Sequence, residues 1–205
     1  MPNLSSLKDP RSRLLAGLAR TLEQTPLTGL YTGDIVREAG VSKRTFYEHF
    51  ANKEECFLAL YLENSGRILQ VLKEATLQPD VPLLDRIERG ARAYLTEMQR
   101  QAGLMKRLYI DILGLGAVGL QAKREIIEQF ADLLIALYEA ERAKMQGMPP
   151  MKPELLLGVI AGLNELILFK IEDGQAEQLL DLVETSQLMI LGSLQGLMHK
   201  GGPGL

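Results

Sequence analysis

The chain has 205 residues, of which 46% are hydrophobic and 24% charged, and its formal net charge is −3. This length allows one large domain or two small ones, and the composition is typical of soluble proteins. A single cysteine excludes an intramolecular disulfide framework. The longest apolar runs are interrupted by charges and no secretion signal is visible, so we expect a cytoplasmic protein without a membrane partner.

The first predicted helix covers about residues 10 to 25, where leucines recur at helical spacing. Pro26 and Gly29 are expected to end it. Arg11 and Arg13 lie near its start, where they are either solvated charges or contacts to phosphate. The net charge does not itself indicate nucleic-acid binding, but a few basic groups gathered on one face would suffice.

Two short helices joined by a tight turn are predicted within residues 31–53. Thr32 is the expected N-cap of the first helix, and Gly40 is expected to end it because glycine readily adopts positive φ. Phe46 and Phe50 are four residues apart, so they share one face of the second helix and are expected to pack inward. This order of helix, turn and helix is the helix-turn-helix pattern.

The second short helix is expected to begin after Ser42, whose hydroxyl is a candidate N-cap. On its helical wheel Arg44 and Tyr47 point away from the apolar face, while Lys43 and Thr45 lie on the flanks of that face. The sequence therefore predicts a recognition helix with an outward polar surface.

This segment closely resembles the DNA-binding motif of the TetR family of transcriptional regulators. The matching runs are T-x-x-I-V-x-x-A-G-V-S at Thr32–Ser42 and T-F-Y-x-H-F-x-N-K-E-E at Thr45–Glu55. The resemblance implies an all-α protein with an N-terminal three-helix helix-turn-helix domain at residues 9–53. A connecting helix at 53–75 would join it to a C-terminal helical ligand-binding and dimerisation domain at 76–200.

The resemblance implies that this motif binds double-stranded DNA. Base edges are read by side chains near the start of a recognition helix, so Lys43 and Arg44 are expected to contact bases. Gly33 occupies a position where some relatives carry a base-reading side chain. Hydroxyl, imidazole and ammonium groups can donate to phosphate oxygens. By resemblance the phosphate contacts are Thr32, Thr45, Tyr47, His49 and Lys53. Alternatives are that His49 only packs between helices and that Thr32 only caps.

The rest of the chain is predicted to be a series of helices separated by glycine and proline. Asn52 is the expected cap of a long helix that ends near residue 75. Gly114–Gly119 is an expected turn, and it lacks the lysine and preceding strand of a phosphate loop. The further helices are expected at residues 83–100, 104–115, 120–146, 154–172 and 176–198.

A homodimer on a palindromic operator follows from the resemblance, because one such motif contacts too little DNA for strong binding. The last two predicted helices are the best candidates for the interface. The helix at 154–172 is apolar nearly all round, which requires burial on more than one side. Paired with their symmetry mates, the two helices would form a four-helix bundle. The alternative is that these residues fill the core of a monomer.

The resemblance also implies a pocket between the middle helices for an apolar or amphipathic effector. The effector must bind better to the state that does not bind DNA. Asp111, Asn164 and Glu165 are polar residues in apolar helices, and a buried one needs a ligand, a water or a protein partner. The other candidates are aromatic or apolar, and core packing is the alternative for each: Tyr94, Met98, Met105, Tyr109, Leu113, Phe130, Leu134 and Phe169.

The sequence therefore predicts a transcriptional regulator, expected to be a repressor, that needs no cofactor or metal and is not an enzyme. The alternatives are an all-helical enzyme or small-molecule carrier, and a helical adaptor that does not bind DNA. No nucleophile–base pair or cofactor loop supports an enzyme, and Asp111 and Glu165 are the only carboxylates that we would test as acid or base. An adaptor would ignore duplex DNA.

Overall fold

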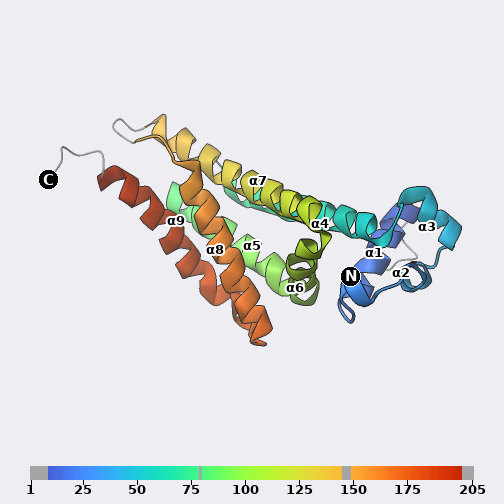
Figure 1. Ribbon diagram of the computed structural model, residues 1–205. Coiled ribbons are helices and arrows are strands. Elements are labelled where there is room, and N and C mark those ends of the chain that lie inside the picture. The colour runs from blue at the N-terminus through green and yellow to red at the C-terminus, as the bar shows by residue number, and fades with distance from the viewer. Residues whose placement is uncertain (1–8, 79, 145–148, 200–205) are drawn as a thin grey trace. The chain divides into compact units, whose positions relative to one another are not determined.

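The computed structural model describes residues 9–78, 80–144 and 149–199, and no strand occurs among them (Figure 1). The predicted all-α fold is confirmed. Residue 200, where the second expected domain ends, lies outside the described residues.

The α-helices are α1 (Pro10–Leu22), α2 (Thr32–Ala39), α3 (Lys43–His49), α4 (Lys53–Thr76), α5 (Leu83–Arg100), α6 (Ala102–Asp111), α7 (Ala117–Arg142), α8 (Pro153–Glu172) and α9 (Leu182–His199). The 3₁₀ helices among the described residues are η2 (Leu27–Gly29), η3 (Ile112–Leu115) and η4 (Ala176–Asp181).

The chain forms two compact units. The first contains the described residues up to Gly66 together with Gly103–Lys123. The second contains Arg67–Ala102 together with the described residues from Arg124 onward. Helices α4 and α7 each contribute residues to both units. No helix in the described part of the chain is long and apolar enough to cross a membrane.

Helix α6 groups with the N-terminal helices, although the sequence had suggested that it belongs with the C-terminal ones. Its last residue, Asp111, accepts a hydrogen bond from the backbone N–H of Leu27 at 2.8 Å. The buried amide of Asn64 on α4 donates to the sulfur of Met105 at 3.1 Å. These long-range contacts explain the grouping and have no signature in local sequence.

Side-chain caps define the N-terminal helices. Asp9 accepts from the backbone N–H of Ser12 at 3.0 Å at the start of α1. Gly40 ends α2 with a φ of 63°, as predicted. The Ser42 hydroxyl accepts from the backbone N–H of Thr45 at 3.0 Å, which confirms Ser42 as the cap of α3.

The prediction that Thr32 caps α2 is wrong. Thr32 is the first helical residue, and Tyr31 stands at the cap position. The carboxylate of Asp34 accepts from the backbone N–H of Tyr31 at 3.0 Å. The first-turn N–H of Asp34 in turn donates to the backbone carbonyl of Tyr31 at 2.9 Å, so the Thr32 hydroxyl is not needed as its acceptor.

Asn52 caps α4, as predicted. Its side-chain oxygen accepts from the backbone N–H of Glu55 at 2.8 Å, and the Glu55 carboxylate accepts from the backbone N–H of Ala51 at 2.6 Å. The first bond is that of a helix N-cap, and the second fixes the residue just before the cap.

Two boundaries in the C-terminal half differ from the expectation. Helix α7 begins at Ala117, inside the expected turn, because Gly116 with a φ of 64° already reverses the chain after η3. Residues 176–181 form the 3₁₀ helix η4 rather than the start of a long helix. Helices α8 and α9 pack against each other, in orange and red in Figure 1.

Candidate DNA-binding and ligand-binding sites

Helix α3 has only seven residues and is held by its apolar face. Phe46 is 0% exposed, Phe50 is buried just after the helix, and their ring centroids lie 5.8 Å apart. The predicted inward packing of these two side chains is confirmed. A helix of this length is unstable in isolation, so its position depends on this packing.

Helices α1 and α2 approach very closely behind α3. A Cβ atom at Gly17 would lie 2.9 Å from the backbone nitrogen of Ala39, so only glycine fits there. The Arg13 guanidinium donates to the carbonyls of Ala39 at 3.1 Å and Gly40 at 2.6 Å. It thereby satisfies carbonyl groups at the negative end of α2. Arg13 therefore has a structural role.

Arg11 also makes internal contacts. Its guanidinium forms an ion pair with Glu63 on α4 and lies 5.6 Å from the centre of the Phe50 ring. The ion pair joins α1 to α4, and the cation–π contact joins α1 to the residue that ends α3. Neither arginine at the start of α1 is a simple solvated charge.

The outward face of α3 carries the predicted base-reading side chains. Lys43 and Arg44 are exposed, and Arg44 donates from Nε to Glu48 at 3.1 Å with 90% of its side chain exposed. Tyr47 is 59% exposed. A Cβ atom at Gly33 would lie 4.0 Å from the Lys43 side chain, so the start of α2 stands beside the start of α3.

The predicted phosphate contacts other than Tyr47 are partly buried. Thr32, Thr45 and His49 have intermediate exposure, and the Thr45 hydroxyl lies 2.9 Å from that of Ser42. The ring of His49 lies 6.4 Å from that of Phe50, so both alternatives considered for His49 remain.

Lys53 has a structural role that the sequence did not predict. Its ammonium donates to the carbonyls of Leu27 at 2.9 Å and Leu30 at 2.7 Å, and its side chain is 22% exposed. Both backbone groups of Leu27 are thus bonded: its carbonyl accepts from Lys53, and its N–H donates to Asp111. An ammonium has three protons, so two such bonds leave one for another acceptor.

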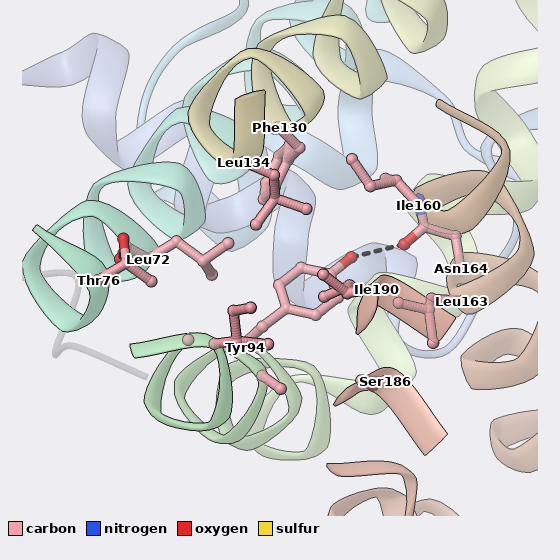
Figure 2. A pocket seen from close by; sticks show the side chains of 13 residues that line it. Leu72, Thr76, Tyr94, Phe130, Leu134, Ile160, Leu163, Asn164, Ser186 and Ile190 are labelled. Carbon is pink, nitrogen blue, oxygen red and sulfur yellow. Dashed lines mark hydrogen bonds between the residues drawn. The ribbon is translucent and has the colours of Figure 1, made fainter. Parts of the chain in front are cut away.

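The second unit contains a cavity of about 60 Å³. Helices α4, α5, α7, α8 and α9 contribute its walls, and Figure 2 shows their side chains converging on it. Among the described residues that line it there is no charged side chain, and most are aliphatic. The polar lining residues are Thr76, Tyr94, Asn164 and Ser186.

A hydrogen bond between two helices crosses this cavity. The Tyr94 hydroxyl on α5 donates to the Asn164 side-chain oxygen on α8 at 2.6 Å, the dashed line in Figure 2. The Tyr94 ring also meets Phe130 of α7 edge-on, with centroids 5.7 Å apart. Asn164 is buried, so its polar group requires such a partner.

The structure brings together only part of the predicted ligand-binding set. Tyr94, Phe130, Leu134 and Asn164 line the cavity. Met98 is buried on α5 outside this lining. Four candidates belong to the first unit, and two are exposed on α8. The four are Met105, Tyr109, Asp111 and Leu113, and the two are Glu165 and Phe169.

The last turn of α4 also lines the cavity, which the sequence did not indicate. A Cβ atom at Gly90 would lie 2.6 Å from the Thr76 side chain, so α5 and α4 are closely packed there. Arg86 is buried and donates to the Thr76 carbonyl at 2.6 Å and to the Glu141 carboxylate at 3.1 Å. In the sequence, Gly90 within amphipathic α5 was the one available sign that α5 and α4 pack closely.

Apolar side chains of α8 and α9 divide into two sets. Leu156, Val159 and Ile167 are buried within the unit. A second set remains exposed: Leu155, Leu166, Phe169 and Leu188. The monomer core therefore accounts for part of the apolar residues that the sequence assigned to an interface, and the exposed set is left without a partner in the described residues.

Comparison with known proteins identifies the N-terminal motif and the fold. Residues 14–60 match the model of the bacterial regulatory proteins of the tetR family. Over 109 residues the chain is 28% identical to the nucleoid occlusion factor SlmA of Marinomonas sp. (strain MWYL1), a match that covers 51% of this chain and 53% of that protein. The match thus spans about half the length of that curated relative.

Two solved structures share the fold over most of the chain. The fatty acid degradation regulator FadR of Bacillus halodurans superposes with a TM-score of 0.77 at 15% identity, covering 88% of this chain and 97% of that one. The regulator FadR of Bacillus subtilis, solved in complex with stearoyl-CoA, gives 0.76 at 15% identity, covering 88% and 98%. The motif match therefore identifies residues 14–60 as similar to the bacterial regulatory proteins of the tetR family, and the likeness to the two solved structures shows the fold of the chain.

Proposed function

We propose that the protein is a transcriptional repressor that binds a palindromic operator as a homodimer and is released by a small-molecule effector. The observation that carries this proposal is the exposed polar face of α3, which is fixed by buried Phe46 and by side-chain caps. A helix presented in this way fits the major groove of DNA. Because it acts on DNA, we place the protein in the cytoplasm.

Arg44 is the proposed reader of a base edge. Its exposed pair with Glu48 must open when it does so, but such surface pairs contribute only about 0–1 kcal/mol. A bidentate contact to guanine contributes about 1–3 kcal/mol of discrimination. Replacing the pair with Glu48 by a contact to guanine therefore favours the DNA-bound state. Lys43, the residue before Arg44, is the second proposed reader of a base edge.

The proposed phosphate contacts set the register of the helix in the groove. They are Thr32, Thr45, Tyr47, His49 and Lys53. Tyr47 is the best supported, since its side chain is exposed and lies three residues after Arg44, on a neighbouring part of the helix surface. For Lys53 the contact must be compatible with its two bonds to carbonyls.

The exposed apolar side chains of α8 and α9 support the homodimer. Phe169 is 58% exposed and Leu188 is 64% exposed, and Leu155 and Leu166 add to this surface. Exposed Gly158 and Gly192 have open space where a Cβ would stand, so a second copy can approach these helices closely. A two-fold dimer would present two α3 helices to the two halves of an operator.

The cavity of the second unit is the proposed effector site. Its apolar lining suits an apolar effector, and FadR of Bacillus subtilis, which shares this fold, was solved with a ligand that has a long apolar chain. Typical ligand pockets measure about 300–1,000 Å³, so side chains must move to admit an effector. Binding then favours the state with the enlarged cavity.

The test is a selection of preferred duplexes from a random DNA library, followed by binding of the preferred and a scrambled duplex. Arg44→Ala should lower the preference roughly tenfold, because the base contact is lost. Arg124→Ala is a matched control, since Arg124 is likewise exposed and pairs with Glu128 four residues later at 2.7 Å. Failure to select any duplex, or equal effects of both variants, would contradict the proposal.

A further inference from the structure

We propose that the cavity of the second unit binds an uncharged molecule with one hydroxyl group and an alkyl tail, and that the hydroxyl inserts between Tyr94 and Asn164. This inference rests on the proposed function only in taking the cavity as the effector site. The ligand class itself follows from the polar groups, the charges and the shape of the lining.

The polar groups of the lining select the position of the hydroxyl. The hydroxyls of Thr76 and Ser186 donate to carbonyls four residues earlier in their own helices, each at 2.7 Å. Their protons are therefore used within α4 and α9. The bond from Tyr94 to Asn164 instead crosses the cavity between two helices, so a ligand can exchange with it.

The charges of the lining exclude an ionised ligand. None of the described lining residues is charged. The buried cation near the lining, Arg86, is occupied by the Thr76 carbonyl and the Glu141 carboxylate. A carboxylate or ammonium placed in the cavity would lose its hydration without gaining a counter-charge.

A hydroxyl preserves the hydrogen bonds that its insertion would break. Its oxygen can accept the proton of Tyr94, and its own proton can be donated to the Asn164 oxygen. A ketone or thioester carbonyl can accept from Tyr94 but has no proton for Asn164, whose buried oxygen would lose its present partner. The site should therefore rank alcohols above carbonyl compounds of equal length.

The shape of the apolar part indicates a tail. A second, smaller cavity of about 10 Å³ lies next to the first and shares Ile87, Leu134 and Ile190 with it. Leu83, Leu137 and Leu156 continue its wall. Rotation of the shared side chains would join the two spaces into one apolar channel, in which an alkyl chain can extend away from Asn164.

The experiment measures binding of four probes of matched length to the full-length protein by titration calorimetry at neutral pH, without DNA. The probes are 1-octanol, 2-octanone, octanoate and octanoyl-CoA. We expect 1-octanol to bind about tenfold more tightly than 2-octanone. We expect it to bind at least about 100-fold more tightly than octanoate, because of the uncompensated charge, and more tightly than octanoyl-CoA.

A pair of asparagine variants tests the position of the hydroxyl. Asn164→Leu removes the acceptor, so the preference for 1-octanol over 2-octanone should fall from about tenfold to near one. Asn64→Leu is the matched control, because Asn64 is an equally buried asparagine, 8% exposed like Asn164, in the first unit. It should keep the wild-type preference. The ranking of the four probes is measured on the wild type and does not depend on these variants.

Three outcomes would overturn this inference: equal or tighter binding of octanoate or octanoyl-CoA, an unchanged preference in Asn164→Leu, or no saturable binding of any probe. Duplex selection on the same sample separates this failure from that of the proposed function. If the protein selects DNA but binds no probe, the proposed DNA-binding function stands and the proposed ligand class is wrong. If the protein binds 1-octanol but selects no duplex, the proposed ligand site stands and the proposed repressor function is wrong.

Discussion

Helices α3 and α5 show how differently the two units use their side chains. The seven-residue helix α3 is anchored by its own fully buried Phe46. Around it Arg13, Lys53 and Asp111 bind backbone groups of neighbouring segments. Helix α5, with eighteen residues, contributes one wall of a cavity that a hydrogen bond from Tyr94 crosses.

The first unit is built to hold its geometry, whereas the second unit tolerates movement of its helices. Side chains that bind backbone carbonyls and N–H groups fix the geometry of the first unit, which a helix needs if it is to read base edges. The second unit leaves unfilled volume between long helices, which a ligand needs if it is to change their packing.

The largest effect is expected from Phe46→Ala compared with Tyr47→Ala. Removal of the buried ring should lower the free energy of unfolding of the first unit by about 3–5 kcal/mol. Removal of the exposed neighbour should cost less than about 0.5 kcal/mol, while weakening DNA binding. Urea unfolding followed by circular dichroism measures both, and equal destabilisation by the two variants would contradict the assigned faces.

Cys56 offers a local readout for these variants. It is fully buried, and burial raises the pKa of its thiol to about 12. At pH 8 the thiolate fraction is therefore very small, and iodoacetamide should react only when the first unit opens. Phe46→Ala should accelerate the reaction strongly and Tyr47→Ala only slightly.

The next effect concerns the partly buried ion pair between Arg86 and Glu141 in the second unit. Arg86→Met should lower the free energy of unfolding by about 3 kcal/mol, because Glu141 and the Thr76 carbonyl lose their shared donor. Arg92→Met is the control on the same helix, where an exposed pair with Glu88 contributes less than about 0.5 kcal/mol. Thermal unfolding distinguishes them. A neutral effect of Arg86→Met would show that the cavity wall is held by apolar packing alone.

Lys53→Met should lower the free energy of unfolding of the first unit by about 2 kcal/mol, because two carbonyls lose a charged donor. The same change should weaken DNA binding on every sequence if Lys53 also contacts phosphate. Unfolding without DNA isolates the first effect, and unchanged stability there would mean that the contacts to Leu27 and Leu30 do not hold the turn.

A small effect is expected from the cap of α2. The backbone N–H of Tyr31, followed by the Arg37 guanidinium, lowers the pKa of Asp34 below its ordinary value of 3.8. Ionised Asp34 therefore stabilises the fold at neutral pH, and this contribution is lost as the pH falls through the folded-state pKa. Asp34→Asn should make stability less dependent on pH below about 4. Acid titrations of both proteins that coincide would contradict this role.

The sequence predicted what depends on local pattern. The spacing of Phe46 and Phe50, the cap at Ser42 and the glycine at position 40 all act within a few residues, so the helix-turn-helix could be recognised. Arg13 and Lys53 could not be assigned, because their partners are backbone carbonyls 23 to 27 residues away.

The cavity was predicted only in part for a similar reason. Asn164 stands out as a polar residue in an apolar helix, but Asp111 and Glu165 were singled out by the same criterion and do not line the cavity. Met105 and Phe169 likewise have apolar character without facing it. Which apolar residues line a space depends on how five helices cross, and helical periodicity does not contain that information. The contact between Gly90 and the last turn of α4 became visible only in three dimensions.

The most direct test of this division is hydrogen exchange of the full-length protein with and without the selected duplex, read by mass spectrometry. We predict that DNA slows exchange in peptides that cover residues 32–53 and leaves peptides from the cavity-lining part of α8 unchanged. Protection confined to the second unit, or no protection in α3, would contradict the assignment of reading to the first unit.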